Sequence, residues 1–313
     1  MNAPRISVVM PVYNRDWCVG DAIESVLATG RADLELIIVD DGSIDGTPSI
    51  VAQYMQREPR RVRALTHAGR ANRGIARSRN LGVSQSRGEF IAFLDSDDVF
   101  LANRFDTAMD WLDARPAMAG CIEPCTLSNM RAPFDEKFSA HLTTVAPADH
   151  GWLRAALFKQ TCWNMPSITL RRASLDRFGG FDERLRFAEE TSLWLRLILA
   201  DAVGVAQAQA PVARVRRHDD HSWNHADRAA DMLTFLHVLT DATRWSPSHG
   251  VAPDARALLI EKLHSFVGEI LCEPHVPARS KAAAWLRGVM LSPSLAFDKR
   301  VVGDVLQAWR TQT

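Results

Sequence analysis

The sequence has no excess of charge of either sign and no long apolar run. Lys and Arg together number 37, as do Asp and Glu, so the formal net charge is +0. A balanced charge gives no overall attraction for nucleic acid. No segment approaches the roughly 18 consecutive apolar residues that span a bilayer, and the apolar run at residues 6–10 is too short for a secretory signal. We therefore expect a cytoplasmic protein that does not bind nucleic acid, with contact to the inner face of the membrane left open.

Cysteine is scarce, and the spacing of the cysteines does not indicate a disulfide framework. The five residues are Cys18, Cys121, Cys125, Cys162 and Cys272. An odd number without regular spacing is typical of free thiols in a reducing compartment. Cys121 and Cys125 are four apart, but no second pair with zinc-finger spacing follows them, so we predict no zinc site there. The composition, 47% hydrophobic and 24% charged, is that of a globular protein.

The first hundred residues alternate between two kinds of apolar pattern. Continuous apolar runs at 6–10, 34–39, 62–65 and 90–94 predict strands, and apolar residues at helical spacing predict helices at 19–27, from 47 onward and at 75–83. The pattern at 102–115 predicts one more helix. Strands that are apolar throughout are typical of a mostly parallel sheet covered by helices on both faces. The fold class we expect is therefore α/β.

Polar residues follow three of these predicted strands at the point where each strand ends. Asn14 comes after the first, Asp40 and Asp41 after the second, and residues 95–98 (Asp-Ser-Asp-Asp) after the last. Parallel sheets bind ligands beyond the carboxyl ends of their strands, so these side chains should converge on one crevice. Two carboxylates in a D-x-D pattern suit Mg²⁺ or Mn²⁺, although a solvated acidic turn would look the same in isolation.

Four ordered motifs give the sequence a family resemblance. They are SVVMPVYN at 7–14, LIIVDDGSIDGT at 36–47, NRGIARSRN at 72–80 and GEFIAFLDSDD at 88–98. Together they resemble the family 2 glycosyltransferases, which have the GT-A fold, a Rossmann-like, mostly parallel sheet with helices on both faces. The likeness is close over residues 5–110 and looser to about residue 222.

The resemblance implies an organisation along the chain. Residues 1–110 would form the nucleotide-sugar-binding half of a GT-A domain, and residues 111–225 the acceptor-binding half with the catalytic base. Residues 226–313 lie outside the resemblance and form a C-terminal helical extension, with helical patterns at 226–244, 253–271, 279–290 and 298–311. Packing onto the catalytic domain, homodimerisation and peripheral membrane docking are all open roles for this extension.

The resemblance also assigns residues to the donor site. Pro11, Val12 and Tyr13 match the loop around the nucleoside base, and Asp41 matches the carboxylate that reads the base edge. Further residues expected at the nucleotide, sugar or metal are Arg79, Asp95, Ser96 and Asp97, with Asp97 in the metal-binding position beside Asp95, and His218 reaching the metal or the diphosphate. A packing role for Tyr13 and a pairing role for Arg79 stay open as the alternatives.

A catalytic base is implied after the Gly-Gly-Phe-Asp turn at 179–182. The family places it second in an acidic pair on the following helix, where this chain has Glu189 and Glu190. The usual residue there is Asp, so the sequence departs from the pattern by one methylene. Glu190 is the expected base and Glu189 its rival, although acids also favour the first turn of a helix for electrostatic reasons. Trp163 either stacks on an acceptor sugar or belongs to the core.

The resemblance implies an inverting, metal-dependent glycosyltransferase. Its cofactor would be Mn²⁺ or Mg²⁺, its donor a nucleotide-diphospho-sugar with UDP favoured, and its acceptor a glycan or lipid-linked intermediate, in bacterial surface-polysaccharide synthesis. A nucleotidyltransferase is one alternative, but Asn14, Arg15 and Asp16 stand where such enzymes carry a glycine-rich loop. A catalytically weak scaffold that binds the nucleotide-sugar is another.

Overall fold

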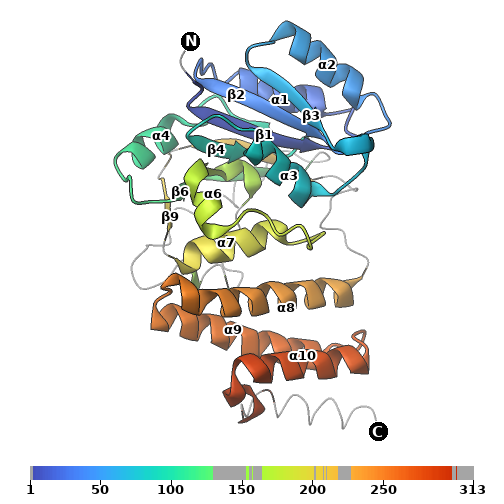
Figure 1. The fold of residues 1–313 in the computed structure, drawn as a ribbon, viewed down its shortest axis with the longest axis vertical. Helices are drawn as coiled ribbons and strands as arrows, with labels where there is room; N and C mark the ends of the chain where they lie inside the picture. Colours follow the sequence, from blue (N-terminus) through green and yellow to red (C-terminus); the bar gives the residue numbers. More distant parts are fainter. Residues whose placement is uncertain are drawn as a thin grey trace. The chain divides into compact units, whose positions relative to one another are not determined.

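The structure of the protein is a computed structural model (Figure 1). It describes residues 3–129, 164–200, 202–206, 210–217 and 227–297, together with the single residues 153, 154, 157, 208 and 301. The chain divides into two compact units. The first comprises residues 1–146, 161–186 and 202–219, and the second comprises residues 147–160, 187–201 and 220–313.

The first unit is built on a seven-stranded sheet in the order β3-β2-β1-β4-β8-β6-β9. Its first four strands run parallel, and they are β1 (Ile6–Val12), β2 (Leu34–Asp40), β3 (Val62–Thr66) and β4 (Phe90–Phe93). Every residue of β1 and β2 is buried. The predicted α/β class with a mostly parallel sheet is thereby confirmed, because strands enclosed on both faces need apolar side chains on both.

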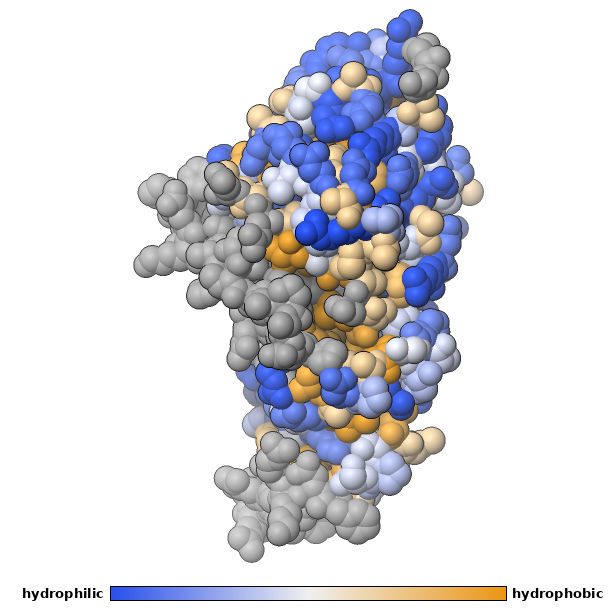
Figure 2. Space-filling view, turned by 90° about the vertical axis from the view of Figure 1, so that its left-hand side faces the viewer, coloured by the Kyte–Doolittle hydropathy of each residue, from blue (hydrophilic) through white to orange (hydrophobic). Residues whose placement is uncertain are grey.

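Helices cover the two faces of this sheet. One face of β1, with Val8 and Met10, shares a buried cluster with residues of α1 (Val19–Leu27). The opposite face packs against α3 (Ile75–Ser84) so closely that a Cβ atom on Gly82 would lie 2.4 Å from a methyl group of Val9. Helix α2 (Thr47–Arg57) joins β2 to β3 and begins with Pro48 in its first turn. The upper part of Figure 2, where these elements lie, exposes mainly hydrophilic side chains.

The rest of the first unit extends the sheet and adds a smaller one. Strand β8 (Ile168–Arg171) is antiparallel to both β4 and β6 (Gly120–Ile122), and β9 (Val203–Val205) is parallel to β6. A three-stranded sheet has the order β5-β10-β7, from β5 (Val99–Phe100), β7 (Cys125–Asn129) and β10 (Ala213–Arg217). Helix α6 (Arg172–Phe178) follows β8. The weak patterning between 117 and 129 gave no strand prediction, because three- and five-residue strands are too short to show a period.

Helix α4 (Asp106–Asp113) is shorter than the helix that the pattern at 102–115 predicts. The chain before it is a turn that carries the fully buried Arg104, whose guanidinium pairs with Glu123 at 2.5 Å. Phe105 then adopts a left-handed conformation, with φ of 86°, which places its ring edge-on against Phe100. The helix can begin only after that residue.

The second unit consists of helices in its described part. These are α7 (Glu189–Leu199), α8 (Arg228–Trp245), α9 (Pro253–Cys272) and α10 (Ala278–Leu291). Aromatic rings join them, because Phe235 of α8 contacts both Phe187 and Phe266 edge-on. The helical periodicity of 226–290 is confirmed, while the pattern predicted at 298–311 lies, apart from residue 301, outside the described residues. Among the described helices none has the length and apolarity to cross a membrane.

Candidate active site

An acidic turn, residues 95–98, follows β4, which is the central strand of the seven-stranded sheet and the last of its four parallel strands. Its backbone closes through a hydrogen bond from the Asp98 N–H to the Asp95 carbonyl at 3.0 Å. The Asp98 carboxyl is buried, and its Oδ1 accepts from the N–H of Arg216 in β10 at 2.9 Å. Burial, and then the charges of Asp97 and Asp95, raise the pKa of Asp98 well above its usual value. Asp98 therefore anchors the turn to the smaller sheet.

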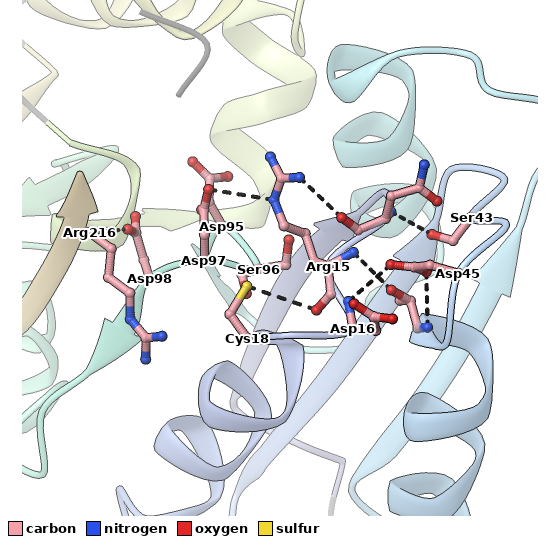
Figure 3. Close-up of polar contacts among 12 residues, drawn as sticks. Arg15, Asp16, Cys18, Ser43, Asp45, Asp95, Ser96, Asp97, Asp98 and Arg216 are labelled. Atoms are coloured by element: carbon pink, nitrogen blue, oxygen red, sulfur yellow. Dashed lines mark hydrogen bonds and ion pairs between the residues drawn. The ribbon is translucent and has the colours of Figure 1, made fainter. Parts of the chain in front are cut away.

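Two arginines from other elements face the carboxylates of Asp95 and Asp97. Arg79 of α3 lies 2.7 Å from Asp95 Oδ1, and its guanidinium lies over the ring of Phe181 at 5.3 Å. Arg15, in the loop after β1, places Nε 3.8 Å from Asp97 Oδ2 and donates from Nη1 to the Asn14 carbonyl at 3.1 Å (Figure 3). The predicted site residues Arg79 and Asp95 thus lie in direct contact.

The acidic turn offers ligands that suit a hard divalent cation. The side chains of Asp95 and Asp97 keep 29% and 17% of their surface exposed, whereas Asp98 is enclosed. Mg²⁺ and Mn²⁺ prefer carboxylate oxygens, and they keep free positions for water and substrate phosphates. Asp95 and Asp97 fit such an ion, because both are accessible and both are charged-oxygen donors. Asp98 does not.

Asp41 directly follows β2 and holds the loop that leads into α3. Its Oδ1 accepts from the N–H of Arg73 at 2.7 Å, and its Oδ2 from the N–H of Gly74 at 2.9 Å. The His67 ring lies 3.5 Å from Oδ1, and the Asp41 N–H bonds back to the Val12 carbonyl. Only 4% of Asp41 is exposed. The carboxylate therefore fixes the loop at 71–74, a contact that the sequence did not reveal.

The loops after β1 and β2 are cross-linked by polar contacts. Asn14, with a positive φ of 50°, donates its N–H to Ser43 Oγ and accepts from the Ile44 N–H at its side-chain oxygen. Its neighbour Arg15 donates its N–H to Thr47 Oγ1 at 2.9 Å. These contacts fix the backbone of both loops at the carboxyl ends of neighbouring strands (Figure 3).

The residues predicted around the nucleoside base differ in their accessibility. Pro11 and Val12 lie on β1 and are buried, while Tyr13 is 43% exposed directly after the strand. Because β1 lies between β2 and β4, its end is flanked by Asp41 on one side and by the acidic turn on the other. The strand order thus places the ends of these three strands next to one another, as the sequence predicted.

Ser96, the second residue of the acidic turn, is held through its backbone. Ser96 has a buried side chain, and its carbonyl accepts from the Cys18 thiol, at 3.3 Å. Burial and the nearby charge of Asp97 raise the pKa of Cys18 to about 12, so the thiol stays protonated and keeps donating. The predicted cofactor contact of Ser96 stays a prediction.

A further positioning residue, Asn80 of α3, escaped the sequence reasoning. Its amide nitrogen donates to the Phe181 carbonyl at 2.9 Å and to Glu183 Oε1 at 3.0 Å, and its oxygen accepts from the Phe181 N–H at 2.9 Å. A Cβ atom on Gly180 would lie 2.6 Å from that oxygen, so a larger residue at 180 would displace the Asn80 amide. Asn80 stands in the motif NRGIARSRN, which was the one signal that could have found it.

The candidate bases lie in the second unit, at the start of α7. Glu189 is buried and Glu190 is half-buried, and Ala188 precedes them in a left-handed conformation with φ of 60°. Their position in the first turn suits the positive end of the helix dipole. The choice between them stays a prediction. His218, assigned to the metal or diphosphate, and Trp163 lie outside the described residues.

Comparison with known proteins decides the family. The profile of glycosyl transferase family 2 matches residues 7–162, which include β1, β2, β4 and the acidic turn. The chain belongs to glycosyl transferase family 2. An uncharacterized glycosyltransferase of Rickettsia felis is 26% identical over 215 residues, covering 67% of this chain and 33% of the relative. The chain spans about a third of the length of the first curated relatives that it matches.

Solved structures share the fold of this family member. TarS residues 1–349 of S. aureus, crystallised in complex with UDP-GlcNAc, align with a TM-score of 0.62 at 19% identity, covering 98% of this chain and 90% of that one. The mannosyltransferase PcManGT of Pyrobaculum calidifontis, in complex with GDP-Man and Mn²⁺, aligns with a TM-score of 0.55 at 18% identity, covering 98% and 85%. Both likenesses support the expected GT-A fold with additional C-terminal helices.

Proposed function

We propose that this chain is an inverting glycosyltransferase that moves a sugar from a nucleoside diphosphate to a glycan or lipid-linked acceptor. UDP is the favoured nucleotide, and synthesis of a bacterial surface polysaccharide is the proposed setting. The observation that carries the proposal is the accessible carboxylate pair Asp95 and Asp97 after β4, beside Arg79 and in line with Asp41 at the ends of three adjacent parallel strands.

A divalent ion, Mn²⁺ or Mg²⁺, is part of this proposal. As the bond between the sugar and the diphosphate breaks, negative charge grows on the departing phosphate, and a dication stabilises that charge. Asp97, with Asp95, would hold the ion, and His218 is proposed as a further ligand. The donors bound by the solved relatives TarS and PcManGT, UDP-GlcNAc and GDP-Man, are both nucleotide-diphospho-sugars and support the proposed donor class.

The nucleoside would lie against Tyr13, with Pro11 and Val12 beneath it and Asp41 at the base edge. An exposed aromatic ring suits stacking on a planar base. Inversion requires a general base that removes a proton from the acceptor hydroxyl, and Glu190 is proposed for that role with Glu189 as the rival. Contact of the protein with the membrane surface, where lipid-linked acceptors reside, and a homodimer through the C-terminal helices are part of the same proposal.

Calorimetric titration of UDP, GDP and dTDP, each with and without Mn²⁺, tests the proposal directly. We expect one nucleotide to bind in a metal-dependent way, and Asp97→Ala to weaken that binding by at least about 100-fold, which corresponds to roughly 3 kcal/mol. Removing the carboxylate removes the charge that anchors the ion, while the nucleotide keeps its other contacts.

Asp33→Ala is the matched control, because Asp33 is also an aspartate of the first unit paired with an arginine, Arg31, at 2.8 Å. It should bind the nucleotide like the wild type. Failure of all three nucleotides to bind the folded wild type would contradict the transferase proposal. Binding of a nucleotide without sugar transfer would instead favour the scaffold alternative.

A further inference from the structure

Arg15 is the more exposed member of the arginine pair that faces the acidic turn. Arg79 is 1% exposed, contacts Asp95 at hydrogen-bond distance and lies over the Phe181 ring, so its guanidinium is enclosed. The Arg15 side chain is 26% exposed, and its 3.8 Å separation from Asp97 Oδ2 exceeds a hydrogen bond. Attraction between the opposite charges holds it there, together with one hydrogen bond to the Asn14 carbonyl.

The backbone at Arg15 is fixed even though the side chain is not. Its N–H donates to Thr47 Oγ1, and the neighbouring N–H groups of Asn14 and Asp16 donate to side chains of the loop after β2. A change in the guanidinium position therefore needs only rotation about side-chain bonds. From a fixed Cα, an arginine side chain can reach either the carboxylate that it faces or a phosphate group close by.

A divalent ion on Asp97 would place two positive charges beside that guanidinium. The guanidinium and the ion are attracted to the same carboxylate and repel each other, and at separations of about 4–5 Å this repulsion is substantial even near water. Binding of the ion must therefore displace Arg15 or share Asp97 with it at a cost in affinity.

We propose that Arg15 competes with the divalent ion for Asp97 and, once displaced, contacts the diphosphate of the donor. The inference rests on the proposed function, since it needs the metal and the nucleotide at this site. Arg15 then couples the two ligands: the ion alone binds weakly, and the diphosphate compensates the displaced arginine when both bind together. Such a coupling is reciprocal, so the ion strengthens nucleotide binding by the same factor.

Binding of Mn²⁺ alone, followed by electron paramagnetic resonance, tests the competition without any catalytic assay. Arg15→Gln removes the competing charge, and we expect it to bind Mn²⁺ on the order of tenfold more tightly than the wild type. Arg15→Lys keeps the charge and should bind Mn²⁺ about as the wild type does. Arg31→Gln is the matched control, because Arg31 has a similarly exposed side chain, at 24%, and pairs with Asp33 instead.

Titration of UDP in EDTA and then in Mn²⁺ measures the second half of the proposal. In Arg15→Gln, UDP should bind about as it does to the wild type without metal, because Arg15 then faces Asp97. The enhancement of UDP binding by Mn²⁺ should be smaller than in the wild type. Thermal unfolding of each variant confirms that the fold is intact.

The outcomes separate this inference from the function on which it rests. If the wild type and Arg15→Gln bind Mn²⁺ equally well, Arg15 does not compete for Asp97, and the inference fails alone. If neither the wild type nor Arg15→Gln binds Mn²⁺ or UDP, both the inference and the proposed function fail.

Discussion

The role of a charged residue in the first unit depends on the residues that surround it. Asp95 and Asp97 were predicted as site residues because a D-x-D motif directly after a buried strand is visible in the sequence. The contact between Arg15 and Asp97 was not, because their positions are far apart in the chain and only the pairing of β1 with β4 brings them together. The motif identifies the two candidate ligands in the sequence, and the fold shows which residues surround them.

Glu35 is a buried carboxylate at the other end of the same strands. It accepts from the Ser7 hydroxyl at 2.7 Å and from Arg87 at 2.7–3.0 Å, and it pairs with Arg63 at 3.1 Å. Burial alone would raise the pKa of Glu35, but these hydrogen bonds and the charge of Arg63 outweigh it and leave the pKa below its usual value. The ionised form is therefore the one that stabilises the fold.

Glu35→Gln should lower the free energy of unfolding by about 2–4 kcal/mol at neutral pH, because it leaves buried donors without their charged acceptor. The pKa of Glu35 is lower in the folded than in the unfolded protein. The stabilisation is therefore complete above the unfolded value of about 4.3 and is lost as pH falls through the folded value. Urea unfolding between pH 7 and pH 3 measures the difference.

Glu24→Gln is the control for that series, since Glu24 also pairs with an arginine, Arg57, but with half of both side chains exposed. Its effect should stay within about 1 kcal/mol. A Glu35→Gln variant as stable as the wild type at neutral pH would show that the buried network contributes nothing to folding.

At the level of elements, the parallel strands and the helices between them follow from apolar periodicity. Helix α1 begins and ends where the pattern places it, because its apolar residues recur at helical spacing and all face one side of the sheet. The short strands β6 and β7 escaped prediction, and so did the late start of α4. In both, tertiary contacts decide the conformation, as the buried pair of Arg104 and Glu123 illustrates.

The contact between α3 and the turn at 179–183 depends on Asn80, which is separated from Phe181 by 101 positions in the chain. Asn80→Ala should lower the free energy of unfolding by about 1–3 kcal/mol, because it removes three hydrogen bonds and leaves the Phe181 backbone groups without these partners. It should also weaken nucleotide binding, since Phe181 lies against Arg79.

Urea unfolding and UDP titration of Asn80→Ala measure these two effects, with Asn103→Ala, a half-buried asparagine in the turn before α4, as the control. If Asn80→Ala unfolds and binds as the control does, the turn is held by other contacts.

For the whole molecule, the sequence predicted the α/β sheet and the helices beyond residue 226. It did not identify the acceptor substrate of the proposed reaction. The proposed donor-site residues lie in ordered motifs at strand ends. The proposed base at 189–190 lies instead on a helix whose sequence indicates only amphipathic packing. Charge and composition could restrict the class of protein, yet they carry no signal for one sugar over another.

Crystals of the protein grown with UDP and Mn²⁺, measured for the anomalous scattering of manganese, test the donor site most directly. We predict one anomalous peak at about 2 Å from a carboxylate oxygen of Asp97, with the diphosphate of UDP on the same ion and the uracil against Tyr13. A manganese peak away from the acidic turn, or UDP bound at another surface, would contradict the proposal that Asp95 and Asp97 form the metal and nucleotide site.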